Sequence, residues 1–249
     1  CLLLNLGILA VIKYTDFFIS NINGIFGTDL AFMRFALPMG ISFYTFQSMG
    51  YLIDVYRGKY PAQDSLGKFA LFVSFFPQVV QGPISRYDDL AQTLYEEHPY
   101  DHRNISFGIQ RICWGFFKKM VIADRLLVAV NELIQNPAEY TGAYVLVAMF
   151  LYAIELYGDF TGGIDITIGI AQVFGIKLVE NFERPFFSKN TAEYWRRWHI
   201  TMGTWFKDYI FYPISVCQPM LKLSKVTREK LGQALGKRIP VYLSTSIVW

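Results

Sequence analysis

One histidine, His199, stands in the part of the chain that is richest in tryptophan, within the run Tyr194-Trp-Arg-Arg-Trp-His199. Burial among aromatic rings disfavours the imidazolium cation, so we expect this ring to stay neutral and able to accept a proton near neutral pH. A positioned neutral imidazole is the most frequent general base in enzymes. A hydrogen-bonded core histidine has the same pattern in sequence, so both interpretations stay open.

The surrounding sequence predicts one helix of about six turns that would hold this histidine. Asn190 is a good N-cap, Glu193 follows at the third helical position, and Pro213 closes the run. Glu193 and Arg197 are spaced i, i+4 in the favourable order for an ion pair. On such a helix one face carries Trp195, Trp198, His199, Met202 and Phe206.

Two acids, Asp159 and Asp165, interrupt an otherwise apolar region, with Thr161 and the pair Gly162-Gly163 between them. Acidic side chains at membrane depth are unfavourable and usually face a cavity or a partner, which makes both acids candidate site residues. The glycines allow a helix break or a close approach of the backbone to a ligand. A loop at the membrane surface is the alternative, and it requires no function.

The composition is that of a protein in contact with lipid. Because 53% of the 249 residues are hydrophobic and 17% are charged, a disordered chain and a nucleic-acid-binding arm are both excluded. The aromatic content of 17% and a mean hydropathy of +0.28 point to the membrane. The net charge of +3, from 23 basic and 20 acidic residues, is too small to imply a polyanion, so we expect no nucleic-acid partner.

The spacing of the cysteines and histidines does not predict a metal or cofactor site. The three cysteines form neither a CxxC pair nor a Cys/His box, which argues against a disulfide scaffold and a zinc module. His98 and His102 have a spacing that suits a metal on a helix, but Pro99 between them spoils a regular helix. Motifs for nucleotide binding, for serine hydrolysis and for zinc proteolysis do not occur. We therefore expect no metal site and no bound cofactor.

The apolar segments predict an all-α fold, a polytopic transmembrane bundle with short re-entrant and amphipathic helices, forming a single membrane domain over residues 1–249. Residues 107–134 predict either a basic amphipathic helix at the membrane surface or a core helix with snorkelling lysines. The other expected segments are the tail of a span or an interfacial helix at 2–12, a crossing at 35–56, a re-entrant or short packed helix at 69–80, an aqueous loop at 85–106, and apolar runs at 143–157 and 166–178.

The ends of the sequence and one basic segment complete the pattern. The chain starts with Cys-Leu-Leu-Leu and ends with a short apolar run at Trp249, so we expect an internal fragment of a longer membrane protein. Residues 219–240 carry six basic side chains against one acidic. By the positive-inside rule this segment is expected to be a loop that faces the cytoplasm, where contact with anionic lipid is compatible.

Seven motifs together resemble the membrane-bound O-acyltransferase family, and within it the bacterial branch that includes alginate O-acetyltransferase. The resemblance covers nearly the whole chain. Its residues are Gly40-Ile-Ser-Phe-Tyr-Thr-Phe-Gln47, Tyr51-Leu-Ile-Asp-Val-Tyr-Arg57, the stretch from Phe69 to Arg86, Phe117-Lys-Lys-Met-Val-Ile-Ala-Asp124, Asp159-Phe-Thr-Gly-Gly-Ile-Asp165, Asn181-Phe-Glu-Arg-Pro185, and above all Tyr194-Trp-Arg-Arg-Trp-His-Ile-Thr201.

The resemblance implies an integral-membrane enzyme of the cell membrane that moves an acyl group, usually acetyl, from a thioester such as acetyl-CoA to a hydroxyl of an extracytoplasmic polysaccharide. It implies that His199 is catalytic, as the first of two family histidines. The second lies in a Gly-x-Trp-His-Gly motif that this chain lacks, so we expect the fragment alone to be inactive. Candidates to line or brace a substrate tunnel are Asp159, Asp165, Trp195, Arg196, Arg197 and Trp198.

The resemblance also implies partners: the acyl thioester donor, the polysaccharide acceptor, membrane lipid, and a separate extracytoplasmic acetyltransferase that finishes the transfer. Two other functions stay open. A related branch transfers D-alanine to teichoic acid from a carrier-protein thioester. A polytopic transporter would share the broken helix with intramembrane acids that the Asp-Gly-Gly-Asp pattern suggests.

Overall fold

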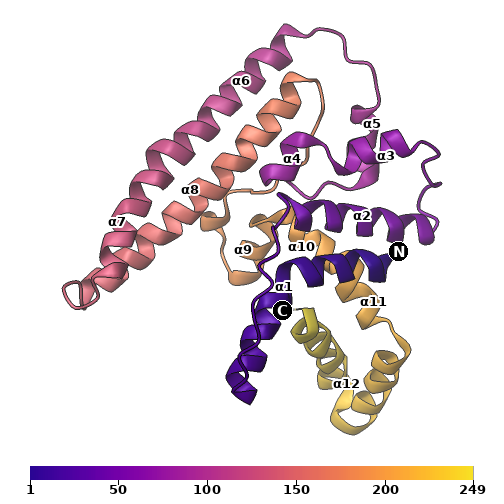
Figure 1. Cartoon of the computed structure of the whole chain (residues 1–249). Helices are drawn as coiled ribbons and strands as arrows, with labels where there is room; N and C mark the ends of the chain where they lie inside the picture. The colour runs from indigo at the N-terminus through magenta and orange to yellow at the C-terminus, as the bar shows by residue number, and fades with distance from the viewer. Residues whose placement is uncertain (249) are drawn as a thin grey trace. The chain divides into compact units, whose positions relative to one another are not determined.

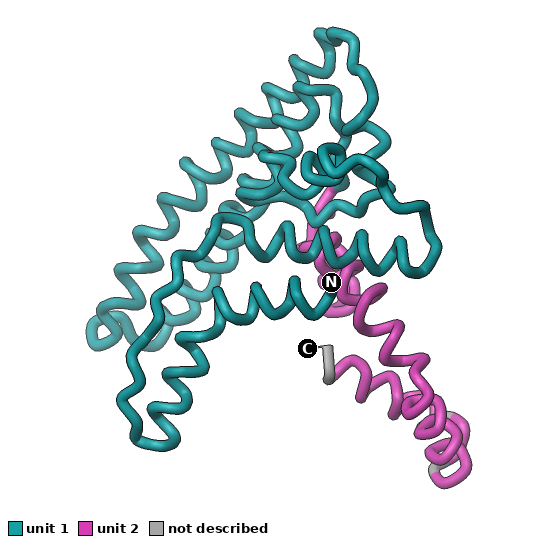
Figure 2. Tube along the Cα trace, turned by 45° about the vertical axis from the view of Figure 1, so that its right-hand side comes forward, with its two compact units in different colours: residues 1–179 teal, residues 180–249 magenta. Residues whose placement is uncertain are grey.

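The structure is a computed structural model that describes residues 1–248, and the last residue of the C-terminal apolar run, Trp249, lies outside the described residues. The described residues form helices and connecting loops without any strand, which confirms the all-α prediction. The chain divides into two compact units, Cys1–Val179 and Glu180–Trp249, drawn in different colours in Figure 2. Each unit is described by itself, and the single-domain expectation stays a prediction.

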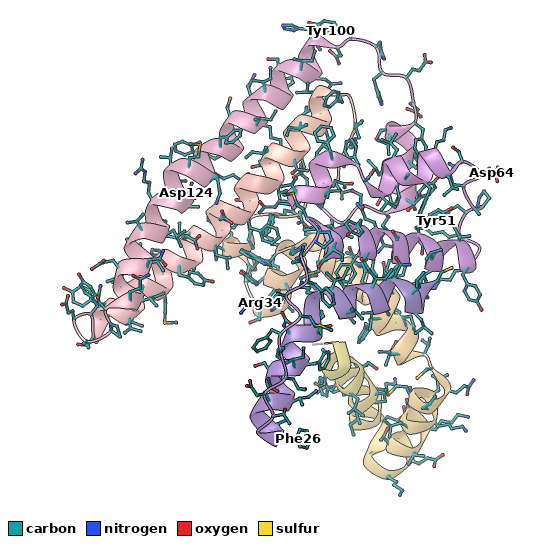
Figure 3. All side chains as sticks on the ribbon, viewed as in Figure 1. Phe26, Arg34, Tyr51, Asp64, Tyr100 and Asp124 are labelled. Carbon is teal, nitrogen blue, oxygen red and sulfur yellow. The ribbon has the colours of Figure 1, made fainter. Side chains whose placement is uncertain are left out.

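The first unit is built around two long helical rods that lie side by side (Figure 1). One rod runs through α6, a π-helical stretch (Phe117–Ala123) and α7, and the other is α8. Figure 3 labels Tyr100 just ahead of the first rod and Asp124 at the start of α7. The helices of this unit are α1 (Leu2–Phe26), α2 (Ile41–Tyr56), α3 (Leu66–Val73), α4 (Phe76–Gln81), α5 (Tyr87–Leu94), α6 (His102–Phe116), α7 (Asp124–Gln135) and α8 (Ala143–Val173).

Glycines let the two rods approach closely. A Cβ atom added at Gly115 would lie 2.6 Å from the carbonyl oxygen of Gly162, and one added at Gly108 would lie 2.8 Å from that of Gly169. Backbone therefore faces backbone at both crossings, as it does between membrane helices, where small residues mark the contact face. The Gly162 position serves this contact, and α8 continues through it as a regular helix.

Large apolar side chains of the two rods point away from the contact between them. Ile109, Phe116, Met120 and Val121 on the first rod are exposed, as are Leu146, Phe150 and their neighbours on α8. A rod with small and polar residues inside and large apolar residues outside requires a hydrocarbon surrounding rather than water. Of the two interpretations of residues 107–134, the packed helix matches this arrangement, with its lysines engaged by acids of α8 rather than snorkelling.

Among the described residues, two helices are long and apolar enough to cross a membrane: α1, with 25 residues, and α8, with 31. The expectation for residues 2–12 was too short, because helix α1 continues through Lys13 and Asp16 as far as Phe26. The crossing expected at 35–56 is wrong in extent, since α2 begins after Gly40, a residue with φ 74°. The short helices expected around 69–80 are present as α3 and α4.

The second unit consists of short helical pieces followed by a long one. Its elements are a 3₁₀ turn (Pro185–Phe187), α9 (Thr191–Arg197), α10 (Ile200–Phe206), a π-helical stretch (Lys207–Phe211), α11 (Tyr212–Ser215) and α12 (Gln218–Val248). Helix α12 is two helices joined at Gly232, where φ is 83°. The basic segment 219–240, expected as a loop, lies within α12.

Candidate active site around His199

The predicted six-turn helix is broken at the histidine itself. Helix α9 ends at Arg197, Trp198 is extended, and His199 adopts a left-handed conformation with φ 46° and ψ 54° before α10 begins at Ile200. The prediction that one helical face unites Trp195, Trp198, His199, Met202 and Phe206 is therefore wrong. A left-handed conformation at a residue other than glycine is strained, and such strain concentrates at functional sites.

A neighbouring segment of chain stabilises the break. The backbone N–H of Glu183 donates to the carbonyl oxygen of Arg197 at 2.9 Å, and the N–H of Ile200 donates to the carbonyl oxygen of Asn181 at 2.9 Å. These are the main-chain groups that the end of α9 and the start of α10 would leave without helical partners. Local sequence cannot reveal such a break, because the bonds that stabilise it come from residues 14 to 19 positions earlier in the chain.

The Asn181 side chain joins the histidine to the helix that follows. It is completely buried, and its Oδ1 lies 3.2 Å from Nδ1 of His199. The same oxygen accepts from the backbone N–H of Thr201 at 3.1 Å and from the Thr201 hydroxyl at 2.9 Å. Three groups thus converge on one amide oxygen, which fixes the position of the imidazole relative to the first turn of α10.

Aromatic rings pack around the turn at His199, but they are not the set that helical spacing predicts. Phe182 packs edge-on against Trp198 at 5.0 Å and lies 6.4 Å from the imidazole of His199. Tyr194 stacks on Trp198 at 5.6 Å. Trp198 is accordingly a packing residue of this cluster, whereas the ring of Trp195 is half exposed.

The imidazole of His199 is buried, with 9% of the residue exposed. It lies outside the two helices long enough to span a membrane. Burial lowers the pKa of His199 to about 4, because the cation loses its hydration there. The ring is therefore neutral at pH 7, as its aromatic surroundings in the sequence indicate.

The capping and ion pair predicted for the start of this region are both present. Asn190 Oδ1 accepts from the backbone N–H of Glu193 at 2.8 Å and so caps α9. Glu193 also accepts from the N–H of Lys189 at 2.9 Å and from the Arg197 guanidinium at 2.6 Å. The Lys189 N–H first, and Arg197 after it, lower the pKa of Glu193 and keep it ionised. Arg197 is therefore engaged in bracing α9.

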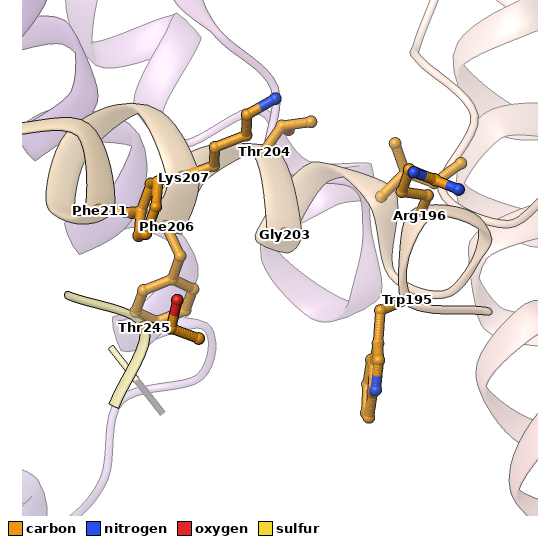
Figure 4. A pocket seen from close by; sticks show the side chains of 9 residues that line it. Trp195, Arg196, Gly203, Thr204, Phe206, Lys207, Phe211 and Thr245 are labelled. Carbon is orange, nitrogen blue, oxygen red and sulfur yellow. The ribbon is translucent and has the colours of Figure 1, made fainter. Parts of the chain in front are cut away.

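A cavity of about 440 Å³ is lined by residues that precede and follow His199 in the chain (Figure 4). Two cations, Arg196 and Lys207, contribute to its wall, together with aromatic rings and threonine hydroxyls. Of the candidates predicted for a tunnel, Trp195 and Arg196 line this cavity, whereas the buried His199 is not among the lining residues. The lining residues are Trp195, Arg196, Ile200, Gly203, Thr204, Phe206, Lys207, Phe211 and Thr245.

Asp159 and Asp165 belong to the first unit and are paired with bases of the neighbouring rod. Asp165 lies 2.9 Å from Arg111 and 2.5 Å from Lys118, and Asp159 is paired with Lys119. Of the alternatives for this stretch, the helix break and the surface loop are both wrong, because α8 runs from Ala143 to Val173 without interruption. The transporter alternative rested on that break and loses its support.

Two groups of residues at the site were not predicted from the sequence. Asn181 was part of a motif but was not proposed for the site, because its contact with a histidine 18 positions later appears only in the structure. Thr204 and Lys207 line the cavity from α10 and the stretch after it, and their spacing from Ile200 would have indicated a shared helical face.

One family model, that of the membrane-bound O-acyltransferases, matches residues 63–227. The chain belongs to the membrane-bound O-acyltransferase family. The family match includes the ion-paired rods, the Asn181 segment and the turn at His199.

Relatives with assigned names extend this result. The chain is 40% identical over 213 residues to a probable alginate O-acetylase of Pseudomonas putida, covering 83% of this chain and 43% of that protein. It is 32% identical over 239 residues to a peptidoglycan O-acetyltransferase of Helicobacter pylori, with 86% and 45% covered. It is 33% identical over 180 residues to a teichoic acid D-alanyltransferase of Bacillus subtilis, with 70% and 44% covered. The chain thus spans less than half the length of these curated relatives.

Proposed function

We propose that this chain is the histidine-bearing part of a multi-pass enzyme of the cell membrane that transfers an acetyl group from a thioester donor to hydroxyls of an extracytoplasmic polysaccharide. The observation that carries the proposal is the buried, neutral imidazole of His199, fixed by Asn181 and next in the chain to Ile200, which lines a cavity with two cations. The names of the relatives, among them O-acetyltransferases of two polysaccharides, support the acyl group and the acceptor class.

The chemistry requires a base and a closed site. The imidazole of His199 takes the proton of the acceptor hydroxyl while the hydroxyl oxygen attacks the thioester carbonyl carbon. A C–O bond forms, the C–S bond breaks, and the sulfur leaves as a thiolate that recovers the proton from the imidazolium. General-base catalysis contributes about 10²- to 10⁴-fold, so positioning of the two substrates must supply much of the remaining acceleration.

The cavity suits the donor half of this reaction. Acyl-CoA and carrier-bound phosphopantetheine both carry phosphate next to a long pantetheine arm that ends in the thioester. Arg196 and Lys207 offer positive charge for the phosphate, and Trp195, Phe206 and Phe211 offer apolar surface for the arm. In this proposal the donor enters from the cytoplasm, the acceptor lies outside, and a separate extracytoplasmic acetyltransferase receives the group.

The full-length protein with His199→Ala tests the proposal. Cells that depend on it should lose ester-linked acetate from their surface polysaccharide, by at least about 100-fold, with the protein still inserted in the membrane. His102→Ala is the matched control, since this histidine is exposed at the start of α6. Normal acetylation in the His199→Ala cells would refute the role of the histidine.

The similarity to a teichoic acid D-alanyltransferase supports a second candidate, transfer of D-alanine from a carrier-protein thioester. The same cells distinguish the two functions, because mild base releases acetate from one product and D-alanine from the other. A loss of ester-linked D-alanine with unchanged acetate in the His199→Ala cells would replace the first candidate by the second.

A further inference from the structure

The amide of Asn181 has one possible orientation, and Thr201 sets it. A backbone N–H can only donate a hydrogen bond, and that of Thr201 lies 3.1 Å from the atom assigned as Oδ1. If the amide were turned by 180°, its NH₂ group would face this donor in a fully buried position, and the hydrogen bond would be lost. The oxygen of Asn181 must therefore lie where Thr201 and His199 meet.

This orientation determines where the imidazole carries its proton. The ring nitrogen Nδ1 of His199 lies 3.2 Å from the same amide oxygen, which can only accept. Nδ1 must therefore be the protonated nitrogen of the neutral ring. The lone pair, and with it the ability to take a proton, then resides on Nε2.

The NH₂ group of the Asn181 amide indicates that this residue has a role beyond packing. Its Nδ2 is buried and has no hydrogen-bond partner among the described residues. An unsatisfied buried donor destabilises a fold, so a residue selected for packing alone would be apolar. The asparagine thus retains a costly group together with an acceptor that serves His199.

We propose that Asn181 is a positioning residue that holds His199 in the Nδ1–H tautomer, so that Nε2 is the atom that receives the hydroxyl proton. The main chain contributes to the same end, because the Asn181 carbonyl oxygen accepts from Ile200 and stabilises the left-handed turn at His199. The inference rests on the proposed function for its consequence in catalysis, but the tautomer itself exists independently of any reaction.

Two substitutions in the full-length protein separate orientation from packing. Asn181→Asp keeps an acceptor for Thr201 and for Nδ1 and adds a negative charge beside the ring, which favours the imidazolium. The acid limb of the pH–rate profile should then move to higher pH, with activity retained at alkaline pH. Asn181→Leu removes the acceptor and should lower kcat by about 10- to 100-fold, as loss of a partner that orients a functional imidazole typically does.

Asn190→Asp is the matched control. It makes the same chemical change in the same unit, at the N-cap of α9, where aspartate caps as well as asparagine does. The acid limb should stay at the wild-type pH in this variant. A limb that moves equally in Asn190→Asp and Asn181→Asp would show a general charge effect and overturn the proposal.

A spectroscopic measurement identifies the tautomer of the His199 ring without any enzymatic turnover. Nitrogen-15 shifts of the His199 ring in the full-length protein report which nitrogen is protonated. The wild type should show the proton on Nδ1, and Asn181→Leu should show a mixture of tautomers. A wild-type ring with its proton on Nε2 overturns the inference whatever the activity is.

The outcomes distinguish this proposal from the proposed function. If His199→Ala abolishes transfer while Asn181→Asp leaves the acid limb in place, the function stands and the positioning role is refuted. If His199→Ala transfers normally while the ring carries its proton on Nδ1, the tautomer assignment stands and the proposed function fails.

Discussion

Two regions of the chain bury polar side chains, and they do so in opposite ways. Between the rods of the first unit, Asp165 meets Lys118 and Arg111, so each buried charge is matched by an opposite charge. At the turn of the second unit, His199 meets a neutral amide and aromatic rings, and it carries no charge. In the paired region, removal of either partner would leave an unmatched buried charge, whereas the neutral region holds an imidazole that is uncharged at pH 7.

In sequence the two regions look alike, since both are polar residues within apolar runs. The difference becomes visible only through their partners. Acids that pair with bases on a neighbouring helix serve the fold, while a buried neutral base beside an amide and aromatic rings is a candidate for chemistry. Four experiments test this contrast.

The largest effect is expected from Gly115→Leu, which attacks the contact between the rods. Even a single Cβ at this position would lie 2.6 Å from the carbonyl oxygen of Gly162, so a leucine forces the helices apart. We expect no folded full-length protein to be recovered from membranes in detergent. Gly24→Leu is the control, because an added Cβ there meets nothing within 4 Å. Equal yield and melting temperature for both variants would contradict the close contact.

Asp165→Asn tests whether the paired region is structural. The change removes the charge opposite Lys118 and Arg111, whose pairing with Asp165 is largely buried: the Lys118 and Asp165 side chains are 11% and 15% exposed. Breaking a buried pair from one side destabilises a protein by about 3–5 kcal/mol. Thermal unfolding in detergent measures this loss, with the exposed Glu139→Gln as control. Unchanged stability with lost acyl transfer would place Asp165 in the catalytic region and break the comparison.

The pH dependence of stability that comes from His199 tests the neutral region. The folded pKa of His199, about 4, lies below its ordinary value of about 6.5, so between these values the unfolded chain binds the proton more strongly. The contribution of His199 to stability is complete above about pH 6.5 and decreases as the pH falls to about 4. NMR titration of the His199 ring measures the midpoint. A midpoint near 6.5 would show that the ring is hydrated.

Asn190→Ala should have the smallest effect. It removes the side chain that accepts from the N–H of Glu193 and so uncaps α9. Loss of an N-cap typically costs about 1 kcal/mol. Faster amide hydrogen exchange confined to α9 would report this loss, whereas Asn190→Asp should exchange like the wild type. Exchange that also increases at Thr201 would mean that α9 and the histidine turn open together.

Local rules predicted local features well. The Asn190 cap, the pair of Glu193 with Arg197 and the short helices around 69–80 all depend on residues within one or two helical turns, and all are present. The helical rod at 107–134 was recognised as well, because its pattern of apolar residues is regular.

Features that depend on distant partners were not predictable in the same way. The left-handed conformation of His199 requires hydrogen bonds from Asn181 and Glu183, and nothing in the 190–213 run indicates them. The glycines at 162 and 163 suggested a break in α8, but Gly162 serves close packing against Gly115 instead. In both places tertiary contacts overrode the local preference of the chain.

The left-handed turn also means that the orientation of the imidazole is a property of the backbone. If the histidine and its flanking tryptophan were placed on an uninterrupted helix, the imidazole would be present but its orientation would differ. A transplanted site must therefore include two segments of the chain, residues 181–183 and the turn at 197–201, with the main-chain hydrogen bonds that join them.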